Sequence, residues 1–288
     1  MARTKIHVGL EIGTSKTCMV VGEVKSDGAV KILGVGLTKS AGVRKGEIYD
    51  FPQVRACVKD ALVKAEDASD VEIGSIFLSV TGSHFVGENN IGTFRLPEGE
   101  KQVAPEHVEE AKNIAREVHI PPDHVHLHSI VRQFRLDGLE QATSPIGLFG
   151  RTVEADFHVV HGIGTRIQNS IKCVREMPLD VDDVVFAPIA VAQVALSRDD
   201  RERGALVIDI GGGTTDYALY FNGAIAASGC IPVGGDHVTN DIHLVTGLPF
   251  TKAESLKIKE GDASADPARS VGSVKVVDEK GFAEAEVR

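Results

Sequence analysis

The chain has 288 residues, of which 42% are hydrophobic and none is Trp, so it has the composition of a globular protein with room for about two domains. Its formal net charge of −10 argues against a nucleic-acid-binding surface, or a surface for anionic membranes, spread over the whole molecule. The cysteines form no Cys-x-x-Cys pair, and neither a signal sequence nor a run of about 18 apolar residues occurs. We therefore expect a reduced, cytoplasmic chain that does not itself span a membrane.

The first 80 residues have the pattern of an α/β unit. Residues 6–37 alternate apolar and polar positions around short turns, which predicts successive strands. The spacing of apolar residues over 54–65, behind Asp50 and Pro52, predicts a helix, and residues 73–80 return as a buried strand.

Residues 84–165 differ from what precedes them. They hold five of the eleven prolines and predict a helix over 105–118 and strands over 124–136 and 153–160, which together indicate an inserted α+β subdomain. Helices are then expected over 167–174 and 188–196. The charged run at 198–203 is expected to be a solvated connection.

A short motif of an acid, Ile, Gly and small residues occurs twice. The copies are Glu11-Ile12-Gly13-Thr14-Ser15-Lys16 and Asp209-Ile210-Gly211-Gly212-Gly213-Thr214. Apolar runs before and after each copy predict two β-hairpins with tight tips. A lone Gly-rich turn is usually an ordinary hairpin, but the repetition at constant offset favours a two-lobed clamp with a shared function.

The chemistry of the tips suits a nucleotide with its metal. Gly and small hydroxyl residues let backbone N–H groups converge on phosphate. The acids Glu11 and Asp209 would repel bare phosphate but could hold a hydrated Mg²⁺ or orient water. We therefore expect a nucleotide and Mg²⁺ between the tips, with Glu11 and Asp209 as metal and catalytic residues, and phosphate contacts from Gly13, Thr14, Ser15, Lys16, Gly211, Gly212, Gly213 and Thr214. The sequence contains no P-loop. It also contains no complete dinucleotide-binding motif, because the third Gly of that motif is missing after Gly162-Ile163-Gly164 and is replaced by Lys39 after Gly34-Val35-Gly36.

The two motifs resemble the phosphate motifs of the actin, Hsp70 and sugar-kinase superfamily, and within it most closely those of the FtsA family of bacterial cell-division proteins. Stretches over 42–50, 79–84, 127–128, 144–151 and 238–242 support this resemblance. The insertion at 84–165 resembles FtsA's own subdomain and is missing from actin and Hsp70.

The resemblance implies an α/β, actin-like, two-lobed ATPase fold. Its first lobe would comprise residues 1–83 and 166–202, with the subdomain 84–165 inserted, and its second lobe residues 203–244 followed by a smaller subdomain from 245 to 288. Because members of this family continue well past residue 288, the second lobe is expected to be incomplete and the chain a fragment.

The resemblance also implies a function. The chain would be an ATP-binding protein that polymerises and tethers FtsZ to the cytoplasmic face of the inner membrane at the division site during septum formation. The implied partners are FtsZ, further copies of the chain, other division proteins through residues 84–165, and the membrane only through a C-terminal helix not contained in this sequence; no nucleic acid is implied. The insertion is expected to lie outside the nucleotide site.

Two features bear on nucleotide chemistry. Glu254 and Lys257 resemble the family's helix that approaches the ribose and adenine, although an exposed helix ion pair would have the same spacing. Ala187 stands where related bacterial actins carry a glutamate that positions the attacking water. A methyl group cannot orient water, and Gln193, the nearest polar substitute, lies well along the helix. At most slow ATP hydrolysis is therefore expected.

Alternatives remain at this level. A pilus-assembly ATPase of FtsA-like fold shares the insertion, and a small-molecule kinase shares the phosphate motifs but would need a catalytic carboxylate that is not evident in the first lobe. His124, His126 and His128 alternate along a predicted strand and could bind zinc, or they could belong to an ordinary half-buried strand.

Overall fold

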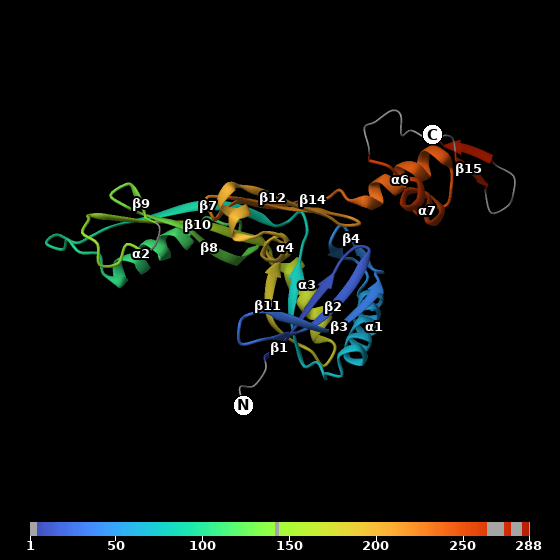
Figure 1. The fold of residues 1–288 in the computed structure, drawn as a ribbon, viewed down its shortest axis with the longest axis horizontal. Coiled ribbons are helices and arrows are strands. Elements are labelled where there is room, and N and C mark those ends of the chain that lie inside the picture. The colour runs from blue at the N-terminus through green and yellow to red at the C-terminus, as the bar shows by residue number, and fades with distance from the viewer. Residues whose placement is uncertain (1–4, 142–143, 264–273, 278–283, 288) are drawn as a thin grey trace. The chain divides into compact units, whose positions relative to one another are not determined.

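The computed structural model describes residues 5–141, 144–263, 274–277 and 284–287 (Figure 1). The chain forms two compact units, residues 1–232 and 233–288. Within the described residues, no helix combines the length and apolarity that crossing a bilayer requires. Each unit is described separately below.

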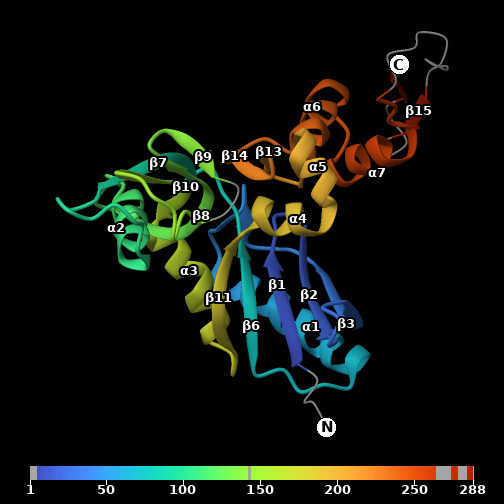
Figure 2. The ribbon, with the colours of Figure 1, turned by 60° about the vertical axis from the view of Figure 1, so that its left-hand side comes forward.

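The first unit begins with a five-stranded sheet in the order β11-β6-β1-β2-β3 (Figure 2). Its strands are β1 (Lys5–Ile12), β2 (Lys16–Val24), β3 (Val30–Lys39), β6 (Ser75–Val80) and β11 (Asp180–Phe186). The first three form an antiparallel meander, whereas β6 pairs in parallel with both β1 and β11. A small hairpin of β4 (Val43–Arg44) and β5 (Glu47–Ile48) precedes the first helix. The strands expected over 6–37 and 73–80 are thus confirmed.

Helix α1 (Phe51–Ser69) covers one face of this sheet (Figure 2). Asp50 caps it by accepting a hydrogen bond from the Gln53 amide at 3.1 Å, and Pro52 stands in its first turn, where the missing N–H costs nothing. The buried residues Val54, Val58, Ala61 and Ala65 recur at helical spacing, so the apolar stripe faces the strands.

Close packing of α1 on β3 depends on Gly36. A Cβ built on Gly36 would lie 1.8 Å from the Ala61 carbonyl oxygen, which belongs to the helix backbone and cannot rotate away. The Gly34-Val35-Gly36 pattern therefore serves helix–strand contact.

We expect Gly36→Ala to lower the free energy of unfolding by about 1–3 kcal/mol, because overpacking forces the helix away from the strand. Denaturant unfolding would measure the change. Gly9→Ala in β1 is the matched control, because a Cβ at Gly9 meets nothing within 4 Å. Equal stability of the two variants would contradict this packing argument.

The inserted subdomain is an α+β unit, as expected. It contains β7 (Val86–Arg95), α2 (Pro105–Arg116), β8 (His124–Leu136), β9 (Leu139–Gln141) and β10 (Thr152–Ile163), with the sheet order β7-β10-β8-β9. Its own hydrophobic core includes Val108, Ala111, Val153 and Phe157. The chain then returns to the first sheet through α3 (Gly164–Arg175) and β11.

The rest of the first unit carries the second copy of the motif. After α4 (Ala187–Ala195) and α5 (Arg198–Arg203), three antiparallel strands follow, β12 (Ala205–Ile210), β13 (Thr215–Phe221) and β14 (Ala224–Ile231). The solvated connection expected over 198–203 is confirmed, and it takes the form of the short helix α5. Ser197 and Asp200 form a capping box, and this local signal starts α5 although the helix buries no side chain.

The second unit contains α6 (Gly235–Thr246), α7 (Phe250–Glu260) and a hairpin of β15 (Val274–Val277) with β16 (Glu284–Val287). Helix α6 ends at Gly247, which takes the left-handed conformation at φ 71°. Helices α6 and α7 pack together, so α6 belongs with the residues that follow it.

Candidate functional site

The two motif copies form hairpin tips with the same turn. In the first, the Gly13 amide donates to the Lys16 carbonyl oxygen at 3.0 Å; in the second, the Gly211 amide donates to the Thr214 carbonyl oxygen at 2.8 Å. Each turn is closed by an Ile–Thr pair of the flanking strands. The predicted hairpins are therefore confirmed, and we name residues 13–16 the first tip and residues 211–214 the second tip.

The two tips meet in the first unit. A Cβ on the buried Gly213 would lie 2.7 Å from Thr14 Oγ1 and 2.9 Å from the Lys45 amide nitrogen. Thr14 Oγ1 in turn accepts a hydrogen bond from the Gly46 amide at 3.0 Å. Since the β4–β5 turn lies against both tips, three loops converge, and only a residue without a side chain fits at Gly213.

Carboxylates gather beside the tips. Burial raises the pKa of Glu11; the charge of Lys16 lowers it, and the charges of Asp209 and Asp216 raise it further. Asp209 is exposed, whereas Asp216 is only 5% exposed. A divalent cation would stabilise carboxylates whose negative charges repel one another, and Mg²⁺ prefers oxygen ligands.

No three His, Cys, Asp or Glu side chains of the described residues converge closely enough to hold a metal ion directly. Mg²⁺ usually keeps several of its waters and takes only one or two carboxylates. The carboxylates fit Mg²⁺ bound chiefly through water and phosphate oxygens.

Asp216 was not among the residues that the sequence singled out. Its carboxylate accepts a hydrogen bond from the Thr81 hydroxyl at 2.5 Å. Burial raises the pKa of Asp216, and the bond from Thr81 opposes that shift. The available signal was the acid that ends the Gly-Gly-Gly-Thr-Thr-Asp run, but its partner, Thr81, is far away in the sequence.

Cys230 lies beside this pair, with its Sγ 3.5 Å from Thr81 Oγ1. Burial and the neighbouring Asp216 raise its pKa to about 12. The thiol is therefore protonated at neutral pH and is a poor nucleophile.

The other predicted phosphate and water-positioning residues differ in burial. Ser15 and Lys16 are exposed in the first tip, whereas Thr214 is buried in the second. Ala187 starts α4 and is 8% exposed, and Gln193 is exposed further along that helix. Their roles in binding or hydrolysis stay predictions.

Glu254 and Lys257 lie in the second unit. Lys257 Nζ is 2.6 Å from the Glu254 carboxylate, 2.8 Å from Thr239 Oγ1 and 3.0 Å from the Gly235 carbonyl oxygen. Thr239 is fully buried and also donates to Glu254. The pair therefore joins α7 to α6, and its contact with ribose and adenine remains a prediction.

The three alternating histidines have three different partners. His124 Nδ1 lies 2.7 Å from His161 Nδ1, and His126 Nε2 lies 2.7 Å from Ser129 Oγ. His128 Nε2 accepts a hydrogen bond from the Phe186 amide at 3.0 Å. Each side chain thus makes its own structural contact in β8 or with a neighbouring strand.

A cavity of about 220 Å³ lies in the same unit, lined by residues outside the two tips. It lies between the β4–β5 hairpin, the loop after β6 and the first turns of α3, with Gly46, Thr81, His84 and Arg166 among its lining residues. Arg166 forms an ion pair with Glu47, and His84 accepts a hydrogen bond from the Ile163 amide at 3.2 Å. Gly46 and Thr81 link the cavity wall to Thr14 and Asp216.

Comparison with known proteins finds two matching family models. The family model of the cell division protein FtsA matches residues 206–288, and that of the SHS2 domain inserted in FtsA matches residues 82–161. The cell division protein FtsA of Escherichia coli (strain K12) is 38% identical over 272 residues, covering 94% of this chain and 64% of the relative. The FtsA protein of Buchnera aphidicola subsp. Baizongia pistaciae (strain Bp) is 36% identical over 277 residues, covering 96% of this chain and 65% of the relative. The chain thus spans just under two thirds of the length of these curated relatives.

Among solved structures, a PilM-PilN type IV pilus biogenesis complex is similar in fold. The TM-score is 0.64 and the identity 16%, and the match covers 88% of this chain and 69% of the other. Together with the sheet order and the two hairpins, this likeness shows an actin-like ATPase fold. Since sequence identity extends over almost the whole chain and the inserted subdomain has its own matching family model, the chain belongs to the FtsA family of cell-division proteins.

Proposed function

We propose that this chain is the ATP-binding part of an FtsA-type cell-division protein and binds MgATP between the two tips. The observation that carries this proposal is the contact of two turns closed by the same hydrogen bond, with Gly213 packed against Thr14 and Lys45. Backbone N–H groups of two such tips can surround a polyphosphate from both sides.

The residues present would divide the work as follows. Gly13 and the glycines of the second tip would donate backbone N–H groups to phosphate oxygens, and Lys16 would add a positive charge. Glu11 and Asp209, with Asp216 nearby, would hold Mg²⁺ chiefly through its water ligands, and the ion when bound would neutralise phosphate charge. Glu254 and Lys257 would contact the adenosine. Hydrolysis would be slow, because the methyl group of Ala187 cannot orient an attacking water.

In the cell, this protein would polymerise and link FtsZ to the inner membrane during septum formation. The identity of 38% to a cell division protein FtsA supports this role. The likeness to the pilus-biogenesis complex is a likeness of fold at 16% identity, so it gives the pilus-assembly alternative less support. Co-sedimentation with FtsZ, using a chain of the relatives' length, would separate the two, and phosphate transfer to a small substrate would instead favour a kinase.

The nucleotide proposal predicts that Asp209→Asn weakens MgATP binding at least about tenfold, since it removes a charge beside the metal. Calorimetric titration would measure the dissociation constant. The matched control is Asp199→Asn, because Asp199 is an exposed acid on α5 whose ion pair with Arg203 spans 3.6 Å. Chelating Mg²⁺ should weaken nucleotide binding more in the wild type than in the Asp209→Asn variant. Wild-type affinity in Asp209→Asn would refute the metal role.

A further inference from the structure

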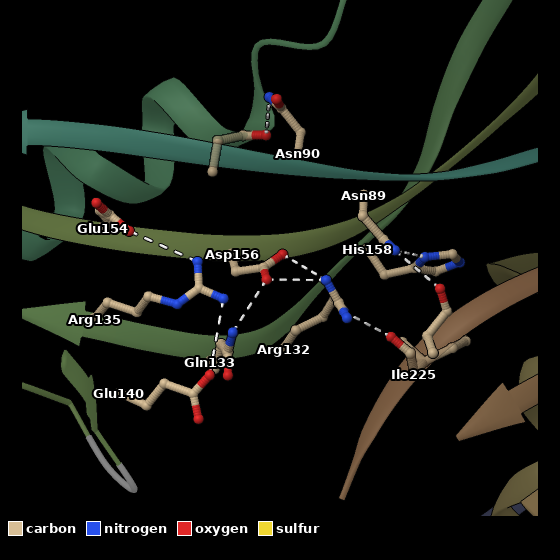
Figure 3. A network of polar contacts seen from close by, with 12 residues as sticks. Asn89, Asn90, Arg132, Gln133, Arg135, Glu140, Glu154, Asp156, His158 and Ile225 are labelled. Carbon is tan, nitrogen blue, oxygen red and sulfur yellow. Dashed lines mark hydrogen bonds and ion pairs between the residues drawn. The ribbon is translucent and has the colours of Figure 1, made fainter. Parts of the chain in front are cut away.

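Strand β14 packs against the inserted subdomain through a buried polar contact (Figure 3). His158 of β10 is completely buried, and its Nε2 lies 2.7 Å from the hydroxyl of Ser228 in β14. The fit is close, since a Cβ on Gly87 of β7 would lie 2.5 Å from Ser228 Oγ and 2.8 Å from His158 Nε2. The insertion is therefore no isolated appendage.

Both ring nitrogens of His158 are connected to β14, one through Asn89 and the other directly through Ser228. Asn89 donates through its Nδ2 to the Ala226 carbonyl oxygen at 2.9 Å, so its Oδ1 is the acceptor for His158 Nδ1 at 2.7 Å. With its proton on Nδ1, His158 must accept the Ser228 hydroxyl proton at Nε2. This order defines one tautomer, and burial, with a contribution from Arg132, lowers the pKa of His158 to about 4, which keeps the ring neutral.

Further contacts hold both ends of the same strand. Arg132 Nε donates to the Ile225 carbonyl oxygen at 2.9 Å near the start of β14 (Figure 3). Thr81, which directly precedes the insertion, contacts Cys230 near its end. Residues of the insertion, together with Thr81 just before it, thus contact β14 near its start, its middle and its end.

Strand β14 in turn sets the position of the second tip. In the sheet order β12-β13-β14 its partner is β13, with Ser228 opposite Ala218 and Cys230 opposite Asp216. Strand β13 starts at Thr215, directly after the second tip. A displacement of β14 is therefore passed through β13 to Gly213, which has no free space against Thr14 and Lys45.

We propose that His158 is a positioning residue for the phosphate site, which it controls from the inserted subdomain by holding β14 through Ser228. This inference rests on the proposed nucleotide binding. Because coupling between sites is reciprocal, nucleotide at the tips strengthens the contact between β14 and the insertion, and a partner that displaces the insertion weakens nucleotide binding.

The test compares His158→Ala with His107→Ala. His107 is also buried in the insertion, at 4% exposure, but it bonds to the Ala104 amide and pairs with Glu100 at 2.8 Å, all within the insertion. Both variants should lower the melting temperature. At a temperature well below both transitions, we expect His158→Ala to weaken MgATP binding at least about fivefold and His107→Ala to leave it within about twofold.

Ser228→Ala removes only a hydroxyl on the other side of the contact and serves if His158→Ala does not fold. It should also weaken MgATP binding, and the double variant should bind no more weakly than His158→Ala alone. Added MgATP should slow amide hydrogen exchange over residues 156–160 in the wild type, with no such change in α2.

The possible results distinguish the proposed MgATP binding from the positioning role of His158. Failure of the wild type to bind MgATP would overturn the proposed function itself. If the wild type binds but His158→Ala and Ser228→Ala match His107→Ala in affinity, the positioning role is overturned while nucleotide binding stands.

Discussion

Arg132→Ala is expected to lower the free energy of unfolding by about 3–5 kcal/mol, because it leaves a buried carboxylate without its partner. Arg132 Nη1 lies 2.9 Å from both carboxylate oxygens of Asp156, whose side chain is 3% exposed. The same guanidinium also donates to Ile225, so the change opens the contact with β14 (Figure 3). Chemical denaturation at neutral pH would measure the loss.

Arg135 provides the matched control on the same strand (Figure 3). Its ion pairs are longer, 3.9 Å to Glu140 and 3.7 Å to Glu154, and Glu140 is 68% exposed. Arg135→Ala should therefore cost less than about 1 kcal/mol. Replacing Arg132 and Asp156 together by Met and Leu should recover most of the stability, because no buried charge then remains. Equal losses in Arg132→Ala and Arg135→Ala would show that the buried pair has no special weight.

The second large effect is a loss of stability in mild acid. Burial is the main cause that lowers the pKa of both His84 and His158 to about 4, and their side chains are 8% and 0% exposed. In the unfolded chain, histidine titrates near about 6.5, so between these values the unfolded state binds more protons. The stabilisation is complete above the unfolded pKa and is lost as the pH falls toward 4. At pH 5 each histidine should lower the free energy of unfolding by about 2 kcal/mol relative to neutral pH.

Two carboxyl groups act in the opposite direction. Burial raises the pKa of Glu11 and Asp216, so their protonation in acid adds stability to the folded state. The histidine contribution is therefore read from variants. The difference in unfolding free energy between pH 7.5 and pH 5 should shrink by about 2 kcal/mol in His84→Gln and again in His158→Gln. His119→Gln, at an exposed position, should leave the difference unchanged. An unaltered difference in both buried-site variants would refute the assignment.

Local patterns were sufficient for most elements of this fold. The spacing of acid, Gly and Thr predicted both hairpins, because a tight turn between alternating strands is specified by adjacent residues. Asp50 and Pro52 similarly predicted the start of α1. The charged run at 198–203 was predicted as a solvated connection, and the capping box of Ser197 and Asp200 shows that this connection is a short helix.

Several features of the site were decided only by tertiary structure. The meeting of Gly213 with Thr14 and Lys45, the bond from Thr81 to Asp216, and the contact of His158 with Ser228 all join residues far apart in the chain. Their pairing depends on which strands become neighbours and on how closely the backbones approach, and neither leaves a periodic signal in the sequence. The sequence by itself determined the hairpins, the inserted subdomain and the family. The tertiary structure brought the carboxylates together and connected the insertion to the second tip, because burial and strand packing act between segments that the sequence separates.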